Sequence, residues 1–289
     1  MGEGRPHEPV MVDDVIRFLG GRGIVIDMTL GSGGHAEALL ESGVERVIGV
    51  DRDPDAVELA TDRLARFGAR FSAVVTRFSD VPAENRVDGV LYDLGVSSMQ
   101  LDHPKRGFSY RADGPLDMRM GPEGESAMDL VNSAAEEELA RVIFEYGEER
   151  RSRQVAAAIV RARSRSPIIT TGELARIVAG AVGGRRGGPH PARRTFQALR
   201  IAVNRELEEL TASLPRAAGT LAPGGRVVVI AYHSLEDRIV KRFMLGEPSL
   251  HVLTKKPLRP SAAEAQHNPR SRSARLRAAE RVLEQDVAA

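Results

Sequence analysis

The chain has 289 residues, of which 42% are hydrophobic, which is enough to bury a large core and excludes disorder throughout. Its formal net charge of +1 excludes a global basic field, so a nucleic-acid site would depend on local clusters of Lys and Arg. Cysteine is absent, which excludes disulfides, zinc thiolates and thiolate nucleophiles.

The first 14 residues lack the apolar stretch of a signal peptide, and no apolar run approaches the ~20 residues of a membrane span. We therefore expect a cytoplasmic protein without a membrane partner. No metal site is predicted.

The first part of the chain alternates short apolar runs with helical patterns. A helix is predicted around residues 37–40, and Asp53 is suited to cap a second helix that begins with Pro54. Because strands that alternate with helices form parallel sheets with right-handed crossovers, this part predicts a doubly wound α/β core. The predicted strands cover residues 24–30, 46–50, 70–75 and 87–94.

No strand is predicted between about Ser97 and Ala222. Helices are expected after a capping box at Ser133 to Glu136, over 152–163, around 174–181, and as one long amphipathic helix from Phe196 to Leu214. We interpret residues 106–195 as a helical subdomain for substrate recognition, inserted into an α/β core that comprises residues 1–105 and 196–289. A fifth strand is predicted over 226–232, followed by two strand-like runs between 250 and 282.

A glycine-rich turn, Gly31 to Gly34, follows the first predicted strand. Asp51 ends the second strand, where a carboxylate can accept hydrogen bonds from both hydroxyls of a ribose. In open α/β sheets, ligands bind at the carboxyl ends of the strands. A glycine turn by itself can be purely structural, but the position of Asp51 favours a nucleoside site.

The identity of the nucleoside cofactor is less clear from the pattern. Gly31, Gly33 and Ala36 fit the dinucleotide fingerprint, which keeps a dinucleotide-dependent oxidoreductase as an alternative. Asp27 and Asp93 make the same edge acidic, which suits a sulfonium and an ammonium better than a pyrophosphate. S-adenosylmethionine is therefore the preferred cofactor, and Phe78 is a candidate to flank its adenine.

Several motifs follow one another over nearly the whole chain: residues 7–10, 27–35, 51–54, 93–101, 106–109, 113–119, 146–150, 190–198, 233–243 and 268–270. In these motifs the sequence resembles the bacterial RsmH (MraW) family of ribosomal RNA small-subunit methyltransferases. The resemblance implies a Rossmann-like class I methyltransferase core with a helical insert after strand four. It also implies methylation of N4 of a cytidine in the decoding region of the small-subunit RNA.

Position by position, the resemblance implies a set of cofactor contacts. They are Gly33, Gly34, His35, Asp51, Phe78, Asp93 and Gln100.

Asp93 and His233 are the candidate catalytic residues. Asp93 is predicted to end strand four and His233 to end strand five at the same edge of the sheet, where either could accept a proton from the methylated amine. The absence of Cys excludes the thiolate route to carbon 5 of a pyrimidine, whereas methylation at N4 needs no such nucleophile.

The expected partner is small-subunit ribosomal RNA or the assembled small subunit, and no DNA is expected. Two basic stretches are candidates for phosphate contacts. A non-catalytic RNA-binding assembly factor remains a second alternative. The basic residues are Arg185, Arg186, Arg193, Arg194, Arg200 and Arg205 in one stretch, and Lys255, Lys256, Arg259, Arg270, Arg272, Arg275 and Arg277 in the other. The aromatic candidates for base stacking are Tyr92, Phe108, Tyr110 and Tyr232.

Overall fold

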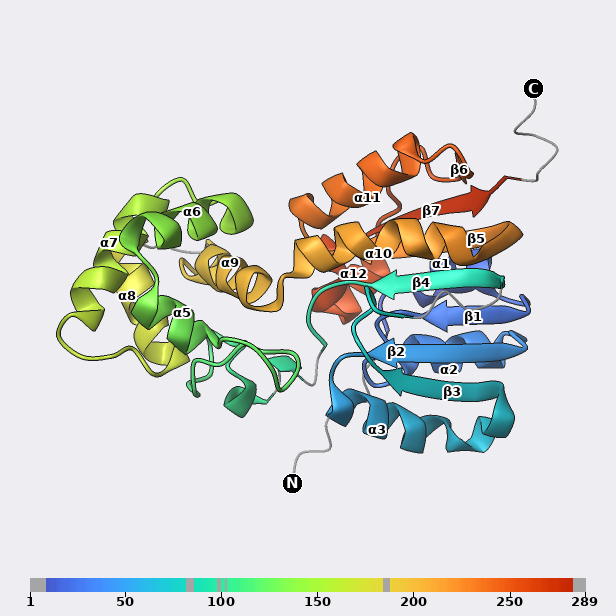
Figure 1. Ribbon diagram of the computed structural model, residues 1–289, viewed down its shortest axis with the longest axis horizontal. Coiled ribbons are helices and arrows are strands. Elements are labelled where there is room, and N and C mark those ends of the chain that lie inside the picture. Colours follow the sequence, from blue (N-terminus) through green and yellow to red (C-terminus); the bar gives the residue numbers. More distant parts are fainter. Residues whose placement is uncertain (1–8, 82–85, 98–99, 102, 184–187, 283–289) are drawn as a thin grey trace. The chain divides into compact units, whose positions relative to one another are not determined.

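The computed structural model describes residues 9–81, 86–97, 100–101, 103–183 and 188–282. The chain forms two compact units (Figure 1). The first, which we call the sheet unit, comprises Met1–Gly95 and Leu207–Ala289, and the second, the helical unit, comprises Val96–Glu206. The inserted subdomain that the sequence predicts, residues 106–195, falls within the helical unit, which extends further at both ends.

The sheet unit contains a seven-stranded sheet in the order β3-β2-β1-β4-β5-β7-β6, which confirms the predicted α/β fold. The first five strands pair in parallel, and β7 runs antiparallel to β5 and β6. Because β2 and β4 lie on opposite sides of β1, the strand order reverses at β1, and the carboxyl ends of β1 and β4 form a switch point. The strands are β1 (Ile24–Asp27), β2 (Arg46–Asp51), β3 (Phe71–Val75), β4 (Val87–Asp93), β5 (Leu221–Ala231), β6 (Leu250–Val252) and β7 (Arg275–Arg281).

Helices cover both faces of this sheet because successive strand residues point to opposite faces. Val25 of β1 belongs to the core cluster shared with α1, α2 and α3, whereas Ile26 belongs to the cluster shared with α10 and α11. As predicted, Asp53 caps α3 by accepting a hydrogen bond from the backbone N–H of Asp55 at 3.2 Å. The helices are α1 (Val12–Leu19), α2 (Gly34–Glu41), α3 (Pro54–Leu64), α10 (Glu206–Thr220), α11 (Ser234–Gly246) and α12 (Ala262–His267).

The helical unit has its own core, in which Phe108, Leu139, Ile159 and Leu174 are buried. Helix α7 has the bounds that the sequence predicts. Among the described residues of the whole chain, no helix is both long and apolar enough to cross a membrane. The helices of this unit are α5 (Ala127–Ser133), α6 (Glu136–Gly147), α7 (Ser152–Arg163), α8 (Thr171–Val182) and α9 (Arg193–Asn204).

The predicted long helix from Phe196 to Leu214 is wrong, because the chain breaks at Arg205 into α9 and α10. Arg205 adopts a left-handed conformation with φ of 52°. The helical spacing of apolar residues continues across Arg205 because each of the two helices buries its own row of apolar side chains. Phe196 lies in the core of the helical unit, whereas Leu214 lies in the core of the sheet unit.

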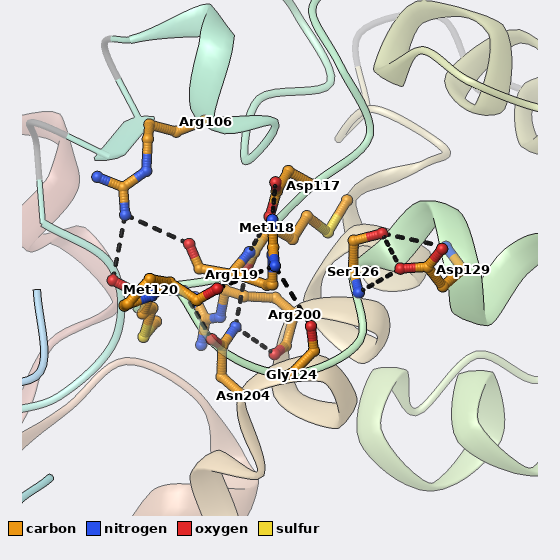
Figure 2. Close-up of polar contacts among 11 residues, drawn as sticks. Arg106, Asp117, Met118, Arg119, Met120, Gly124, Ser126, Asp129, Arg200 and Asn204 are labelled. Atoms are coloured by element: carbon orange, nitrogen blue, oxygen red, sulfur yellow. Dashed lines mark hydrogen bonds and ion pairs between the residues drawn. The ribbon is translucent and has the colours of Figure 1, made fainter.

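The side chain of Asn204, the last residue of α9, binds both its own helix and another segment of the helical unit (Figure 2). Its Nδ2 donates to the carbonyls of Met118 and Arg200 at 2.7 and 2.9 Å. Its Oδ1 accepts from the N–H of Met120 at 2.8 Å. The end of α9 is therefore fixed by side-chain bonds that the apolar periodicity does not reveal.

The predicted capping box at Ser133 to Glu136 is also wrong. Ser133 ends α5, where its hydroxyl donates to the carbonyl of Asp129, and Ala135 precedes α6 without a side-chain cap. The capping box of this region belongs to α5. There the Ser126 hydroxyl accepts from Asp129 N–H at 3.2 Å, while the Asp129 carboxylate accepts from Ser126 N–H at 2.9 Å.

Substitution of these two serines is therefore expected to change the stability of the protein by different amounts. Ser126→Ala is expected to lower the free energy of unfolding by about 1 kcal/mol, because the buried cap leaves helix N–H groups without acceptors. Ser133→Ala, at an exposed position, should change it by less than about 0.5 kcal/mol. Urea denaturation of both variants measures this difference, and equal values for the two would contradict the assignment of the cap.

Candidate active site

The segment after β1 crosses the ends of both neighbouring strands. Met28 N–H donates to the carbonyl of Leu91 in β4, and Leu30 N–H donates to the carbonyl of Val50 in β2, each at 2.9 Å. The strand therefore ends at Asp27 and not at Leu30 as the sequence predicts, since residues 28–30 bond alternately to the two sides. This segment brings the glycine turn over the switch point.

The glycine turn uses backbone conformations that favour glycine. Gly31 and Gly33 have φ of 50° and 79°. A Cβ on Gly33 would approach side chains of Leu64 and Ala60 at 3.1 and 3.2 Å, so the turn packs against α3 with no spare room. Gly33 immediately precedes α2, whose first-turn N–H groups have no acceptor within the helix and are free to face a ligand.

Asp51 lies at the end of β2, as predicted, and organises the loop next to it. Its Oδ2 accepts from Gly31 N–H at 2.8 Å, and its Oδ1 accepts from Asp53 N–H at 3.0 Å. Burial raises the pKa of Asp51, and these backbone donors partly oppose that shift. Arg52 N–H is a third backbone donor to this carboxylate; because each carboxylate oxygen can accept two hydrogen bonds, capacity remains for a ligand hydroxyl.

Asp93 ends β4 and is held from three directions. Its backbone N–H donates to the Thr29 hydroxyl at 2.6 Å, and its Oδ1 accepts from the Tyr232 hydroxyl at 2.7 Å. Its Oδ2 faces His35 Nε2 at 3.4 Å. Burial raises the pKa of Tyr232 well above its usual value, and the charge of Asp93 adds to the shift, so the tyrosine hydroxyl stays a donor.

Asp27 and His35 lie buried behind Asp93. Burial raises the pKa of Asp27 to about 6. Burial lowers the pKa of His35, but contact with Asp93 and the charge of Asp27 outweigh it, so the net shift is upward. Asp27 Oδ2 and His35 Nδ1 have no hydrogen-bond partner among the residues that the structure describes. Buried polar atoms of this kind fit a site completed by a ligand.

His233 does not end a strand, because β5 stops at Ala231. It precedes α11 and caps it: Nδ1 accepts from Glu236 N–H at 3.4 Å, and Nε2 lies 3.0 Å from Glu236 Oε1. The Glu236 carboxylate in turn accepts from Tyr232 N–H at 2.8 Å. His233 thus holds the start of α11, and both ring nitrogens already face Glu236.

The other two predicted cofactor residues lie in different units. Phe78, after β3, packs edge to face against Tyr92 with ring centroids 5.7 Å apart, and remains partly exposed. Gln100 is buried in the helical unit, where it exchanges hydrogen bonds with Ser97 at 3.1 and 3.2 Å. Both assignments remain predictions.

Several basic residues predicted to contact RNA form ion pairs within the protein. Arg275 and Arg277 both bind the Asp237 carboxylate, at 3.2 and 2.6 Å, and Arg277 is only 7% exposed. Arg200 pairs with Glu206 through two hydrogen bonds of 2.8 Å. Arg193, Arg194, Lys255, Lys256, Arg259, Arg270 and Arg272 are exposed, whereas Arg185 and Arg186 lie outside the described residues.

Two of the four aromatic residues predicted to stack on bases are core residues. Tyr92 and Phe108 are 0% and 6% exposed, so neither can receive a base. Tyr110 stacks on His190 with centroids 4.8 Å apart. Tyr232 uses its hydroxyl on Asp93, a role that the sequence analysis missed, although its position just after strand five, next to strand four, was a usable signal.

A doubly wound sheet with a glycine turn after its first strand and a carboxylate after its second is the arrangement of the nucleoside-cofactor-binding α/β class. Comparison with known proteins is more specific. The family model described as the MraW methylase family matches residues 4–282. The chain belongs to this family, which confirms the predicted resemblance and decides against a dinucleotide-dependent oxidoreductase.

Individual relatives agree with this membership. A "Ribosomal RNA small subunit methyltransferase H" from Methylobacterium sp. is 53% identical over 96% of this chain and 91% of its own length. A protein of the same name from Methylorubrum extorquens is 50% identical over 95% of this chain and 86% of its own length. A solved rRNA methylase from Streptococcus thermophilus aligns over 94% of both chains at 11% identity and a TM-score of 0.46, too distant to support an argument.

Proposed function

We propose that this chain methylates N4 of a cytidine in the decoding region of small-subunit ribosomal RNA, with S-adenosylmethionine as the methyl donor. The names of the relatives support small-subunit ribosomal RNA as the substrate, and the family description supports methyl transfer as the reaction. The observation that carries the proposed chemistry is Asp93, whose Oδ1 accepts a hydrogen bond from Tyr232 and whose Oδ2 lies 3.4 Å from His35 Nε2.

The residues at the switch point fit this cofactor. When bound, S-adenosylmethionine supplies a methyl group on a positively charged sulfonium. Asp27 and Asp93 give this edge of the sheet a negative character that favours a cation, and Asp27 Oδ2 lacks a hydrogen-bond partner among the described residues. We assign cofactor contacts to Gly33, Gly34, His35, Asp51, Phe78, Asp93 and Gln100.

Asp93 also suits the acceptor amine. The lone pair of a cytosine N4 is delocalised into the ring, which makes it a poor nucleophile. An acceptor for its N–H bonds localises that pair and stabilises the positive charge that develops on nitrogen. We assign to Asp93 Oδ2, which lies 3.4 Å from His35 Nε2, the role of accepting such a bond and then the proton, since Oδ1 is already bound by Tyr232. His233, engaged in capping α11, is not retained in this role.

Mass mapping of nucleosides tests the proposed function directly. Small-subunit RNA from cells that lack the protein should be incubated with the purified chain and S-adenosylmethionine, then digested. The expected product is N4-methylcytidine at a single position in the decoding region. Methyl groups on carbon 5 or on a 2′-oxygen would contradict the proposed acceptor, and RNA binding without any methyl transfer would favour a non-catalytic assembly factor.

Asp51→Ala is expected to weaken cofactor binding about tenfold through loss of charge-assisted hydrogen bonds to the ribose. Calorimetry with S-adenosylhomocysteine measures this affinity. Asp53→Ala is the matched control, because Asp53 lies two residues away and caps α3. An unchanged affinity in Asp51→Ala would remove Asp51 from the binding site.

A further inference from the structure

Charge is distributed very unevenly along the helical unit. Residues 150–205 contain 13 Arg and no Lys, and Glu173 is their single acidic residue. Residues 136–149, by contrast, contain six Glu and one Arg. The acidic helix α6 is therefore followed in the sequence by a segment whose arginines are balanced by almost no acidic residues of that segment.

Helix α7 turns part of this charge outward. Its buried residues, Ser152, Val155, Ala156 and Ile159, define the face that packs into the core of the helical unit. Arg153 and Arg161 are both exposed; at 100° per residue, Arg161 lies opposite the buried face and Arg153 lies on its flank. They are eight residues apart, so their Cα atoms are separated by about 12 Å along the helix axis.

An open hollow of about 420 Å³ lies between these two arginines. It is lined by Arg153, Gln154, Ala157 and Arg161 of α7 and by Ala181 of α8. Its lining thus combines two small alanine side chains with two arginines. The small side chains leave room for an extended anionic chain, and the arginines supply positive charge to bind it.

Neither arginine is neutralised by a carboxylate of the described residues. In the part of the chain that the structure describes, Arg153 and Arg161 make no ion pair with a carboxylate. Other arginines of the same segment are occupied: Arg163 donates to the carbonyl of Val131 at 2.7 Å, and Arg194 lies 3.6 Å from Glu149. Arginine without lysine favours bidentate recognition of phosphate oxygens over simple charge attraction.

We infer that the α7–α8 hollow, lined by Arg153 and Arg161, is a docking surface for the phosphate backbone of the RNA substrate. This inference rests on the proposed function, since it takes RNA to be the substrate. It assigns to α7 a binding role that is separate from the two basic stretches indicated by sequence analysis.

The test uses the full chain and a transcript of the small-subunit RNA that carries the decoding region. The double variant Arg153→Gln/Arg161→Gln is expected to bind it about tenfold more weakly at moderate salt, with the slope of log K against log salt reduced by about 1.4, or about 0.7 for each lost phosphate contact. Cofactor affinity should not change. Arg153→Lys/Arg161→Lys, which keeps the charges, should retain most of the slope.

Arg141→Gln is the matched control, because Arg141 is an exposed arginine of the same unit that pairs with Glu145 at 2.9 Å. If the slope of log K against log salt is unaltered in the glutamine double variant, the proposal of a docking surface is contradicted. Weaker binding to assembled subunits with normal binding to free RNA would also overturn it, in favour of a protein contact. If the unmodified chain methylates the RNA in either case, the proposed function survives; if it neither binds nor methylates RNA, both proposals fail.

Discussion

Asp93→Asn is expected to lower the rate of methyl transfer about 100-fold at saturating cofactor, as measured by single-turnover kinetics on the RNA. The substitution keeps the shape of the side chain and a carbonyl acceptor, but it removes the charge opposite the nitrogen that becomes positive. It also removes the basic group that holds the proton afterwards. Saturating cofactor separates this effect from any loss of affinity, since Asp93 is proposed to serve both.

Tyr232→Phe tests whether the fixed geometry of Asp93 matters. Loss of the 2.7 Å hydrogen bond to Oδ1 should slow the reaction about tenfold in the unmodified background. In the Asp93→Asn background the same change should have little further effect, because residues that act through one another are not additive. Equal effects in both backgrounds would show that Tyr232 acts independently of Asp93.

Tyr92→Phe is the control for general destabilisation. Tyr92 is fully buried, and its hydroxyl bonds to Ser213 at 2.5 Å, so its loss should affect stability but leave the rate near normal.

A near-normal rate in Asp93→Asn itself would leave backbone carbonyls as the acceptors of the amine protons.

The sheet of the first half of the chain was predictable because local signals agree there. Short apolar runs, the cap at Asp53 and the glycine turn each point to the same alternation of strands and helices. The break at Arg205 was not predictable from periodicity, because α9 and α10 carry apolar stripes in phase and bury them in different cores. Helices α1, α5, α11 and α12 were also missed.

The site divides in the same way. Asp51 and Asp93 were predictable because strand ends meet at one edge of a parallel sheet, whatever the details of the loops. The role of Tyr232, the capping role of His233 and the burial of Arg277 depend on side-chain partners distant in sequence. The sequence shows where a charged or polar side chain lies along the chain. Only the structure shows whether that side chain already pairs with another residue of the protein.

Asn204 indicates a structural role for one of the motifs that this chain shares with its family. Residues 113–119 form one of the matched motifs, and Met118 within it has a left-handed φ of 63°. Asn204 binds the backbone of Met118 and Met120, while Arg106 donates to the carbonyls of Arg119 and Met120 at 3.3 and 3.1 Å (Figure 2). The motif is thereby fixed to the end of α9.

Asn204→Ala is therefore expected to lower the free energy of unfolding of the helical unit by about 3 kcal/mol. The side chain is 2% exposed, and its removal leaves the Met120 N–H and the carbonyls of Met118 and Arg200 without this partner, at about 1 kcal/mol or more each. Urea denaturation gives the loss, and hydrogen exchange of the α9 amides locates it in this unit. Ser164→Ala, at an exposed position after α7, should change stability by less than about 0.5 kcal/mol. A loss below about 1 kcal/mol in Asn204→Ala would mean that water replaces the amide, and that the backbone around Met118 holds its left-handed turn without it.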